Sequence, residues 1–155
     1  MLDEHTRQLL DRPGLLGVVC TSRSDGSPQA NPVWFRLARD GTGDGHEIRI
    51  WTDQARRWVA NLRRQPRVAF SVHENASPWA SVSISAQATL LDLTPNATLE
   101  EIRAICARYL QADEVEAYIE QWPQTRSIIA LRPTSAFAAQ AFEDPVADRR
   151  RPESS

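Results

Sequence analysis

The sequence is divided by turn residues into short segments in which apolar and polar residues alternate. Alternation with period two indicates strands with one buried face, and an Asp-Gly pair between two such segments is a strong hairpin signal. Asp25-Gly26 lies between the first two segments, and Pro32 in the second cannot donate to a ladder, which favours an edge strand, a strand start or a bulge. We expect antiparallel strands at residues 15–21, 29–38, 47–52, 67–73, 79–91, 126–131 and 135–142.

Apolar residues at helical spacing occupy the segments between and around these strands. In residues 53–64 they recur three and four positions apart, the pattern of a helix with one face on a core. Thr98 and Glu101 form a capping box ahead of another apolar stripe. The expected helices cover residues 3–11, 53–64, 98–110 and 113–121. Together, strands and helices predict a β-rich α+β fold.

The chain has the length and composition of one domain. Its 155 residues are 41% apolar and 25% charged, which is typical of a soluble globular protein. Residues 143–155 are polar and rich in Arg, Pro and Ser, so we expect a disordered tail there. A single domain is predicted for residues 1–142.

Charge and composition argue against several kinds of partner. The net charge of −2 does not draw the whole protein toward nucleic acid or an acidic membrane. No apolar run reaches bilayer length and residues 1–8 lack the apolar core of a signal peptide, so we expect a cytoplasmic protein without a membrane segment. The three histidines are isolated and the two cysteines form no Cys-x-x-Cys pair, which predicts no metal site.

The junction between the strand that ends at Thr52 and the helix after it is the first candidate site. Helix N-termini carry unpaired N–H groups and a partial positive charge, so they bind phosphate readily. Every basic residue of the chain is arginine, and Arg56 and Arg57 bring guanidinium groups to this junction. Two alternatives stay open: the arginines form a solvated helix face, or Asp53 caps the helix.

Trp34 and Trp51 lie on neighbouring expected strands near Pro32. Flat aromatic surfaces suit a tricyclic ring, and ordinary core packing is the alternative for each tryptophan. No familiar nucleophile, P-loop or metalloprotease motif is present. Catalytic residues therefore stay unassigned, and any redox chemistry would come from a cofactor.

Four segments, in this order, resemble the pyridoxamine 5′-phosphate oxidase-like proteins: residues 16–21, 25–29, 31–35 and 61–68. The last reads Asn-Leu-Arg-Arg-Gln-Pro-Arg-Val and is similar to the Asn-Leu-Arg-Arg-Asp-Pro-Arg-Val segment of that family. The resemblance spans roughly residues 14–140. It implies a six- to seven-stranded antiparallel split β-barrel with peripheral helices, and a homodimer with two cofactor sites at the subunit interface.

The resemblance also implies which residues hold the cofactor. It places residues 32–34 beside a flavin or deazaflavin ring, residues 51–52 along the ribityl chain, and the phosphate on Arg56, with Arg57 assisting. The candidate cofactor-binding residues are Asn31, Pro32, Val33, Trp34, Trp51, Thr52, Arg56, Arg57 and Asn61. Trp58 departs from the family, which places a phosphate-binding lysine there, and a tryptophan cannot neutralise a phosphate.

The resemblance predicts an oxidoreductase that passes a hydride between its cofactor, FMN or coenzyme F-420, and a small conjugated substrate. The alternative is a non-catalytic split-barrel protein that binds a flavin, haem or another planar ligand, and Trp58 in place of lysine motivates it. A third reading is a structural dimer with no ligand.

Overall fold

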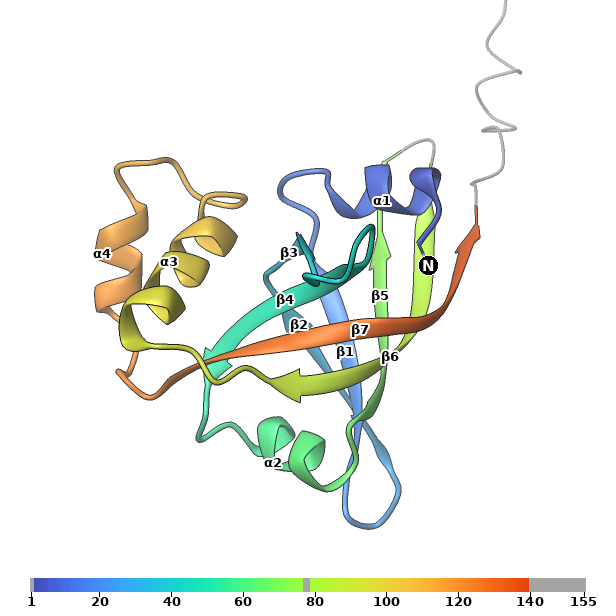
Figure 1. Cartoon of the computed structure of the whole chain (residues 1–155), viewed down its shortest axis with the longest axis horizontal. Helices are drawn as coiled ribbons and strands as arrows, with labels where there is room; N and C mark the ends of the chain where they lie inside the picture. Colours follow the sequence, from blue (N-terminus) through green and yellow to red (C-terminus); the bar gives the residue numbers. More distant parts are fainter. Residues whose placement is uncertain (1, 77–78, 140–155) are drawn as a thin grey trace, which may run out of the picture.

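Seven antiparallel strands form one curled sheet, a half-barrel, in the computed structural model, which describes residues 2–76 and 79–139 (Figure 1). The strand order across the sheet is β2-β1-β5-β6-β7-β4-β3. Within these residues four helices surround the sheet, which confirms the β-rich α+β fold. The strands are β1 (Gly17–Ser22), β2 (Pro28–Val33), β3 (Phe35–Arg39), β4 (His46–Asp53), β5 (Arg67–His73), β6 (Ser81–Leu90) and β7 (Arg126–Ala139). The helices are α1 (Glu4–Leu10), α2 (Arg57–Arg64), α3 (Pro95–Cys106) and α4 (Val115–Glu120).

The strand expected at residues 29–38 is divided at Trp34, and its two halves lie at opposite edges of the sheet. β2 pairs with β1, whereas β3 pairs with β4. At the division, the backbone N–H of Phe35 donates to the Tyr109 hydroxyl at 3.1 Å, and this hydroxyl donates to the Leu15 carbonyl at 2.8 Å. A side chain from outside the sheet therefore supplies hydrogen bonds where the chain changes strand partners.

Besides Pro28, which begins β2, two prolines lie inside the described strands, at places that tolerate a missing N–H. Pro32 is in the edge strand β2, in line with the expectation. Pro133 is in β7 beside a bulge, where the register with β6 shifts after Ser85 and the Thr134 hydroxyl donates to the Ser85 carbonyl at 3.0 Å. The bulge lets one strand run on, so the two closing strands expected at 126–131 and 135–142 are a single β7. Residues 140–142 lie outside the described residues.

Helix α3 begins three residues before the expected capping box. Thr94 is the N-cap, its hydroxyl accepting from the Ala97 N–H at 3.2 Å, and Pro95 occupies the first turn. Proline is common at this position, because its fixed φ suits the start of a helix and no N–H donor is needed there. The prediction of a capping box at Thr98 and Glu101 is wrong, since both residues lie inside the helix.

Helix α2 begins at Arg57, four residues after the expected start. The Asp53 carboxylate accepts from the Ala55 N–H at 3.0 Å and from the Thr125 hydroxyl at 2.7 Å, which holds a turn before the helix. Arg56 is the N-cap residue and makes no side-chain capping bond. The alternative that Asp53 caps the helix is therefore wrong, and the N-terminus of α2 carries no side-chain cap.

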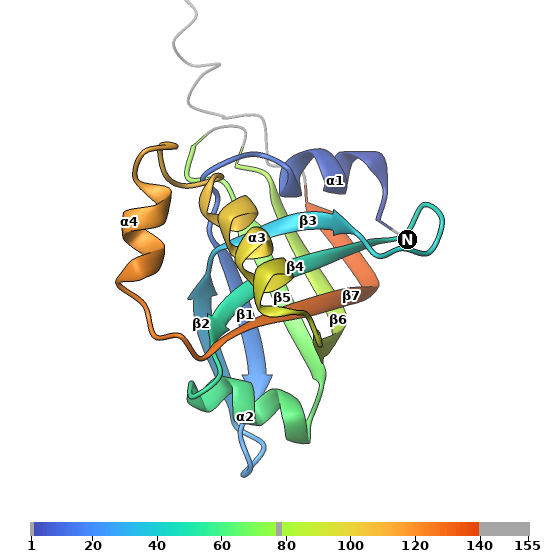
Figure 2. The ribbon, with the colours of Figure 1, turned by 60° about the vertical axis from the view of Figure 1, so that its left-hand side comes forward.

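Two apolar clusters hold the fold together. One fills the barrel, where the fully buried rings of Phe35 and Phe70 meet edge to face at 5.1 Å. The other lies between the sheet and the helices α3 and α4, which pack on its outer side (Figure 2). Trp34 and Trp51 pack against this second cluster, whose buried members are Ile102, Cys106, Val115, Ile119 and Ile128.

A buried ion-pair network fixes α3 to the sheet. The carboxylate of Glu101, only 7% exposed, accepts from Arg36 at 2.8 Å and from Arg49 at 2.7 Å. Arg49 also donates to Glu47 at 2.9 Å. Burial raises the pKa of Glu101, but hydrogen bonds from the two arginines outweigh it and hold that pKa below its ordinary value. The network sets the position of α3 over β3 and β4.

Candidate functional site

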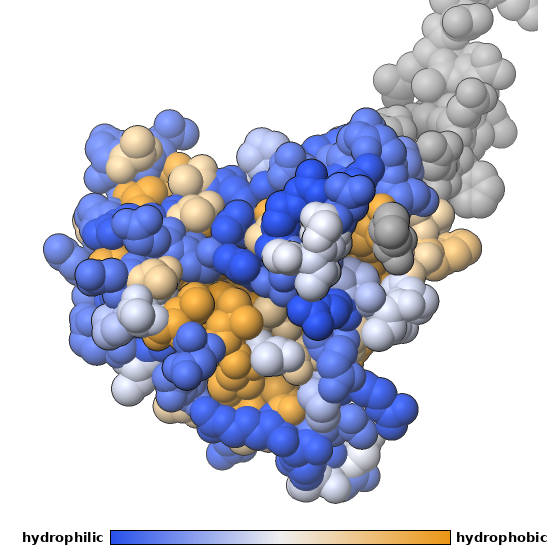
Figure 3. Space-filling model, in the orientation of Figure 1, coloured by the Kyte–Doolittle hydropathy of each residue, from blue (hydrophilic) through white to orange (hydrophobic). Residues whose placement is uncertain are grey.

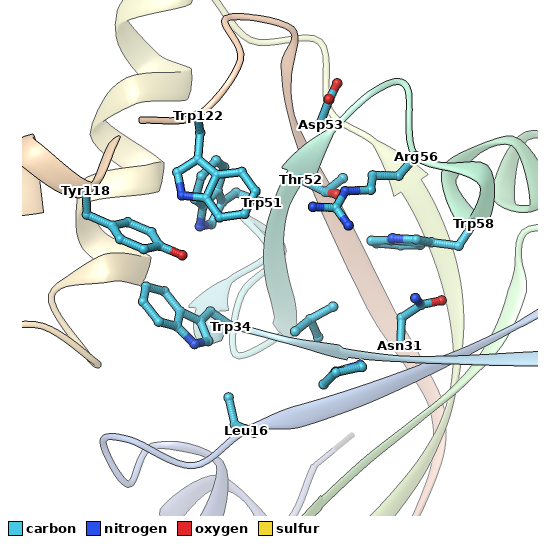
Figure 4. A pocket seen from close by; sticks show the side chains of 12 residues that line it. Leu16, Asn31, Trp34, Trp51, Thr52, Asp53, Arg56, Trp58, Tyr118 and Trp122 are labelled. Atoms are coloured by element: carbon cyan, nitrogen blue, oxygen red, sulfur yellow. The ribbon is translucent and has the colours of Figure 1, made fainter. Parts of the chain in front are cut away.

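A cavity of about 350 Å³ lies where β2, β4, the turn before α2 and the end of α4 meet (Figure 4). Aromatic side chains gather at one end of it and polar side chains at the other. Seven of the nine predicted cofactor-binding residues line it: Asn31, Pro32, Val33, Trp34, Trp51, Thr52 and Arg56. The remaining lining residues are Leu16, Asp53, Trp58, Tyr118 and Trp122.

Trp34 is the centre of the aromatic end. Its ring stacks on Tyr109 at 4.6 Å with an interplanar angle of 6°, and on Tyr118 at 4.9 Å with an angle of 23°. Stacked rings of this kind add stability beyond their buried area. Both readings of Trp34 therefore hold in part, because it packs against the second cluster and also lines the cavity.

Tyr118 and Trp122 form a wall of the cavity that the sequence analysis missed. The Trp51 ring meets each of them edge to face, at 6.5 Å from Tyr118 and 5.9 Å from Trp122. Tyr118 lies in α4 and Trp122 follows it, four residues apart, so that both reach the same side. The four-residue spacing of these two aromatic residues could have indicated a shared helix face. Nothing in the neighbouring sequence, however, indicates that this face packs against β4.

Arg56 brings a positive charge to the polar end. Its guanidinium carbon lies 5.8 Å from the centre of the Trp122 ring, a distance at which a cation interacts with an aromatic face. Among the described residues no hydrogen bond or ion pair engages this guanidinium, and the residue is exposed. Figure 4 shows it extending toward the space beside Thr52. Arg56 is thus available to an anionic group in the cavity.

Trp58 occupies the position where the resemblance expects lysine, and it lines the polar end of the cavity. The residue is 4% exposed and belongs to the barrel core. Its indole fills, with a flat apolar surface, the place of an ammonium group. The lysine that the resemblance expects is therefore absent from the described lining, where Arg56 is the cation.

Asn31 presents an unused acceptor in the cavity lining. Its Oδ1 is buried and has no hydrogen-bond partner among the described residues. Buried polar atoms are nearly always paired, so an unpaired acceptor in a cavity wall fits a ligand that donates an N–H.

The remaining two predicted residues, Arg57 and Asn61, do not line the cavity. Arg57 is exposed at the first position of α2. The Asn61 amide donates to the Thr21 hydroxyl at 3.0 Å and to the Gln29 side-chain carbonyl at 3.1 Å. Asn61 is buried and ties α2 to the β1–β2 hairpin, so its described contacts are with the fold.

Few lining groups titrate. Hydrogen bonds from the Ala55 N–H and the Thr125 hydroxyl lower the pKa of Asp53, and burial raises the pKa of Tyr118. Asp53 is thus ionised and Tyr118 neutral near pH 7. No group of three or more His, Cys, Asp and Glu that could hold a metal occurs in residues 2–76 and 79–139. Nor does any helix in that part of the chain have the length and apolarity to cross a membrane.

The curled antiparallel sheet, open along one side and flanked by helices, makes this chain a split β-barrel protein with an aromatic-lined cavity beside the turn before α2. Residues 2–139 match the family model for Pyridoxamine 5′-phosphate oxidase, and the chain belongs to this family. The family expected from residues 16–21, 25–29, 31–35 and 61–68 is thereby confirmed.

Solved structures of similar fold come from proteins with different descriptions. A conserved hypothetical protein from Mycobacterium tuberculosis has a TM-score of 0.71 and 22% identity, over 90% of this chain and 85% of that chain. A protein described as an F-420 reductase has a TM-score of 0.64 and 29% identity, over 88% of this chain and 98% of that chain. A haem storage protein from Vibrio cholerae has a TM-score of 0.60 and 16% identity, over 87% of this chain and 91% of that chain. Among curated protein sequences no match is found.

Proposed function

We propose that this chain binds a flavin-type cofactor, FMN or coenzyme F-420, in the cavity and uses it to pass a hydride between the cofactor and a small conjugated substrate. The two-ended lining of the cavity carries this proposal. Aromatic rings flank one end, and at the other lies the Arg56 guanidinium, which has no hydrogen-bond or ion-pair partner among the described residues. A tricyclic ring joined through a ribityl chain to a phosphate has the same division into a flat apolar part and an anionic part.

The polar end would hold the phosphate. Arg56 offers a guanidinium with several N–H donors, and Thr52, on β4, adds a hydroxyl to the same lining. Arg57 begins α2 directly after Arg56 and is the candidate to assist from outside the cavity. The α2 N-terminus has no side-chain cap, so its partial positive charge faces no competing side-chain oxygen.

The aromatic end would orient the ring. Trp34 and Trp51 are held by their tyrosine and tryptophan neighbours, so they present fixed surfaces. Residues 32–33 complete the wall next to Trp34. When bound, a flavin or deazaflavin supplies the hydride chemistry. The protein's part is to bind, orient and exclude water.

Coenzyme F-420 is the cofactor that the comparisons favour. The F-420 reductase shares 29% identity with this chain and is covered over 98% of its length. The sequence of residues 61–68 and the two helices before the last strand also support coenzyme F-420. FMN stays the alternative cofactor within the same proposal.

The proposal includes a cytoplasmic homodimer in which residues 1–142 act as one domain. Exposed apolar side chains support association, since Leu16 is 50% exposed and Phe137 is 72% exposed. Apolar side chains also gather in one area over the ends of β6 and β7, above α2 (Figure 3). Leu16 lines the cavity, so a partner that covers it would complete the site.

A non-catalytic binding protein is the second candidate, favoured by Trp58 in place of the phosphate-binding lysine. A haem would need an axial ligand such as His, Cys, Met or Tyr. Tyr118 is the one side chain of these types in the described lining. A haem would thus depend on Tyr118, whereas a flavin needs no axial ligand and is the favoured ligand of a binding protein as well.

Titration of the purified protein with FMN, coenzyme F-420 and hemin tests these proposals. We expect quenching of ligand fluorescence by a flavin-type cofactor at micromolar concentration, and oxidation of the reduced, bound cofactor by a conjugated acceptor. Tight binding without such turnover would favour the binding protein. If neither FMN nor coenzyme F-420 binds at micromolar concentration, the flavin proposal is wrong.

A further inference from the structure

Two residues that line the cavity lie just beyond the end of the β1–β2 ladder. The pairing of β1 with β2 ends at Gly17 and Val33. Leu16 precedes β1 and Trp34 follows β2, and both line the cavity (Figure 4). Neither residue belongs to a strand of the described chain, so ladder hydrogen bonds do not fix them. Other contacts must set their places at the aromatic end.

The Tyr109 hydroxyl connects the two segments one position further on. Continuing the same register places Leu15 opposite Phe35. The Phe35 N–H donates to the Tyr109 hydroxyl at 3.1 Å, and the hydroxyl donates to the Leu15 carbonyl at 2.8 Å. A single hydroxyl thus bridges the backbone next to Trp34 and the backbone next to Leu16, where the strand pairing has ended.

The Tyr109 ring also supports the indole of Trp34. The two rings stack at 4.6 Å with an interplanar angle of 6°. Trp34 lines the cavity and Tyr109 does not, so Tyr109 supports the indole from outside the cavity. Burial raises the pKa of Tyr109, so the hydroxyl keeps its proton near neutral pH and can donate to Leu15. One residue therefore holds both the ring of Trp34 and the backbone beside it.

Arg108 fastens the segment that leads to Leu16. The Arg108 carbonyl accepts from the Gly14 N–H at 2.9 Å. Its guanidinium donates to three backbone carbonyls at 2.8, 3.2 and 2.9 Å, those of Leu10, Asp11 and Arg12. Residues 108 and 109, which follow α3, therefore hold residues 10–15 before the chain reaches the cavity.

We propose that Tyr109 is a positioning residue of the cavity, which places Trp34 and Leu16 for the ring of the bound cofactor without touching that ring. This inference deepens the proposed function and rests on it, because the ring must occupy the aromatic end. Tyr109 acts through the hydroxyl bridge and the ring stack. A change at Tyr109 should therefore weaken binding of the ring and leave the contribution of Arg56, at the polar end, as it is.

Tyr109→Phe tests the bridge, because it removes the hydroxyl and keeps a ring that can stack on Trp34. Fluorescence titration of the folded variant uses FMN, coenzyme F-420 and their phosphate-free ring compounds, riboflavin and the deazaflavin core. We expect a cofactor and its ring compound to bind about three- to tenfold more weakly than to the wild type, the net contribution of one hydrogen bond. An equal loss for both ligands locates the effect at the aromatic end.

Val82→Ala is the matched control for a general loss of stability. Val82 is buried in the barrel core and does not line the cavity, so this substitution destabilises the fold without touching the bridge. We expect it to bind all four ligands like the wild type. The near-UV circular dichroism of tryptophan should change in Tyr109→Phe, where Trp34 shifts, and stay as in the wild type in Val82→Ala.

A measurement on the wild type keeps the test open if Tyr109→Phe does not fold. Coupling between two sites is reciprocal, so a bridge that favours ring binding is itself stabilised by the bound ring. The Phe35 N–H donates into this bridge. We expect it to exchange with solvent at least about threefold more slowly at saturating cofactor. An unchanged exchange rate overturns the inference.

The outcomes separate this inference from the proposed function. If neither FMN nor coenzyme F-420 binds the wild type, the proposed function and this inference both fail. If a cofactor binds Tyr109→Phe as tightly as the wild type, the inference fails and the proposed function stands. The inference also fails if Val82→Ala loses as much affinity as Tyr109→Phe, or if the loss appears for the cofactor and not for its ring compound.

Discussion

Replacing Glu101 by alanine tests whether the ion-pair network holds α3 on the sheet. The Glu101 carboxylate is 7% exposed and accepts hydrogen bonds from both Arg36 and Arg49. Removing it leaves the Arg36 guanidinium without its carboxylate partner, while Arg49 keeps its bond to Glu47. Breaking a buried pair in this way costs about 3–5 kcal/mol, and we expect Glu101→Ala to lower the free energy of unfolding by that amount. For a chain of this length the melting temperature would fall by roughly 6–20 °C.

Urea unfolding followed by tryptophan fluorescence measures this loss, because Trp34 and Trp51 lie in the cluster that α3 and α4 cover. Glu100→Ala is the matched control, since Glu100 is the exposed neighbour on the same helix and should change stability by less than about 0.5 kcal/mol. A loss below about 1 kcal/mol in Glu101→Ala, or an equal loss in the control, would refute the reasoning.

The same pair of proteins has a defined pH dependence. The folded-state pKa of Glu101 is lowered from 4.5, because hydrogen bonds from Arg36 and Arg49 outweigh the burial that raises it. A lowered folded pKa means that the stabilisation is fully present above the unfolded value and is lost as pH falls through the folded value. The difference between wild type and Glu101→Ala should therefore be constant near pH 7 and shrink below about pH 4.5.

Three further substitutions follow from the structure. Arg56→Ala should weaken flavin binding by about 1.5–3 kcal/mol in a fluorescence titration, while Arg63→Ala, an exposed arginine on the same helix, leaves it unchanged; equal affinities would remove Arg56 from the site. Tyr109→Phe should lower the free energy of unfolding by about 1–3 kcal/mol in urea, since it unpairs a backbone N–H and a carbonyl at the strand division. Gly17→Ala should lower the free energy of unfolding by about 1–3 kcal/mol in urea, because its Cβ would clash with the Phe70 ring; unchanged stability would contradict this.

Elements with a local signal were predictable. β5 runs from Arg67 to His73, as the alternation in that segment indicated, because one face of the strand is buried throughout. The apolar stripe of α2 was also identified, since Trp58, Val59 and Leu62 are all buried. Local rules failed at helix starts, where Pro95 and the hydrogen-bonded turn at Asp53 decide the first residue.

The division at Trp34 was not predictable from pattern. Burial alternates through residues 33–35 as it would in an unbroken strand, so nothing in the alternation marks the change of partner. The hydrogen bonds that permit the change come from Tyr109, 74 residues away from Phe35. The same limit applies to the cavity. Its β2 and β4 side was identified from neighbouring strands, whereas Tyr118 and Trp122 reach it from a distant helix.

The place of β7 in the sheet has a consequence for how the chain folds. β7 is the strand between β6 and β4, so within the described residues it joins the four strands on one side to the two on the other. In the pairing of β7 with β4, Leu131 lies opposite Ile48, so the pairing joins distant parts of the chain. Such contacts form late because a long loop must close first. During synthesis, β3 and β4 would leave the ribosome with no strand between them and β6, and the barrel would close only when residues 126–139 emerge.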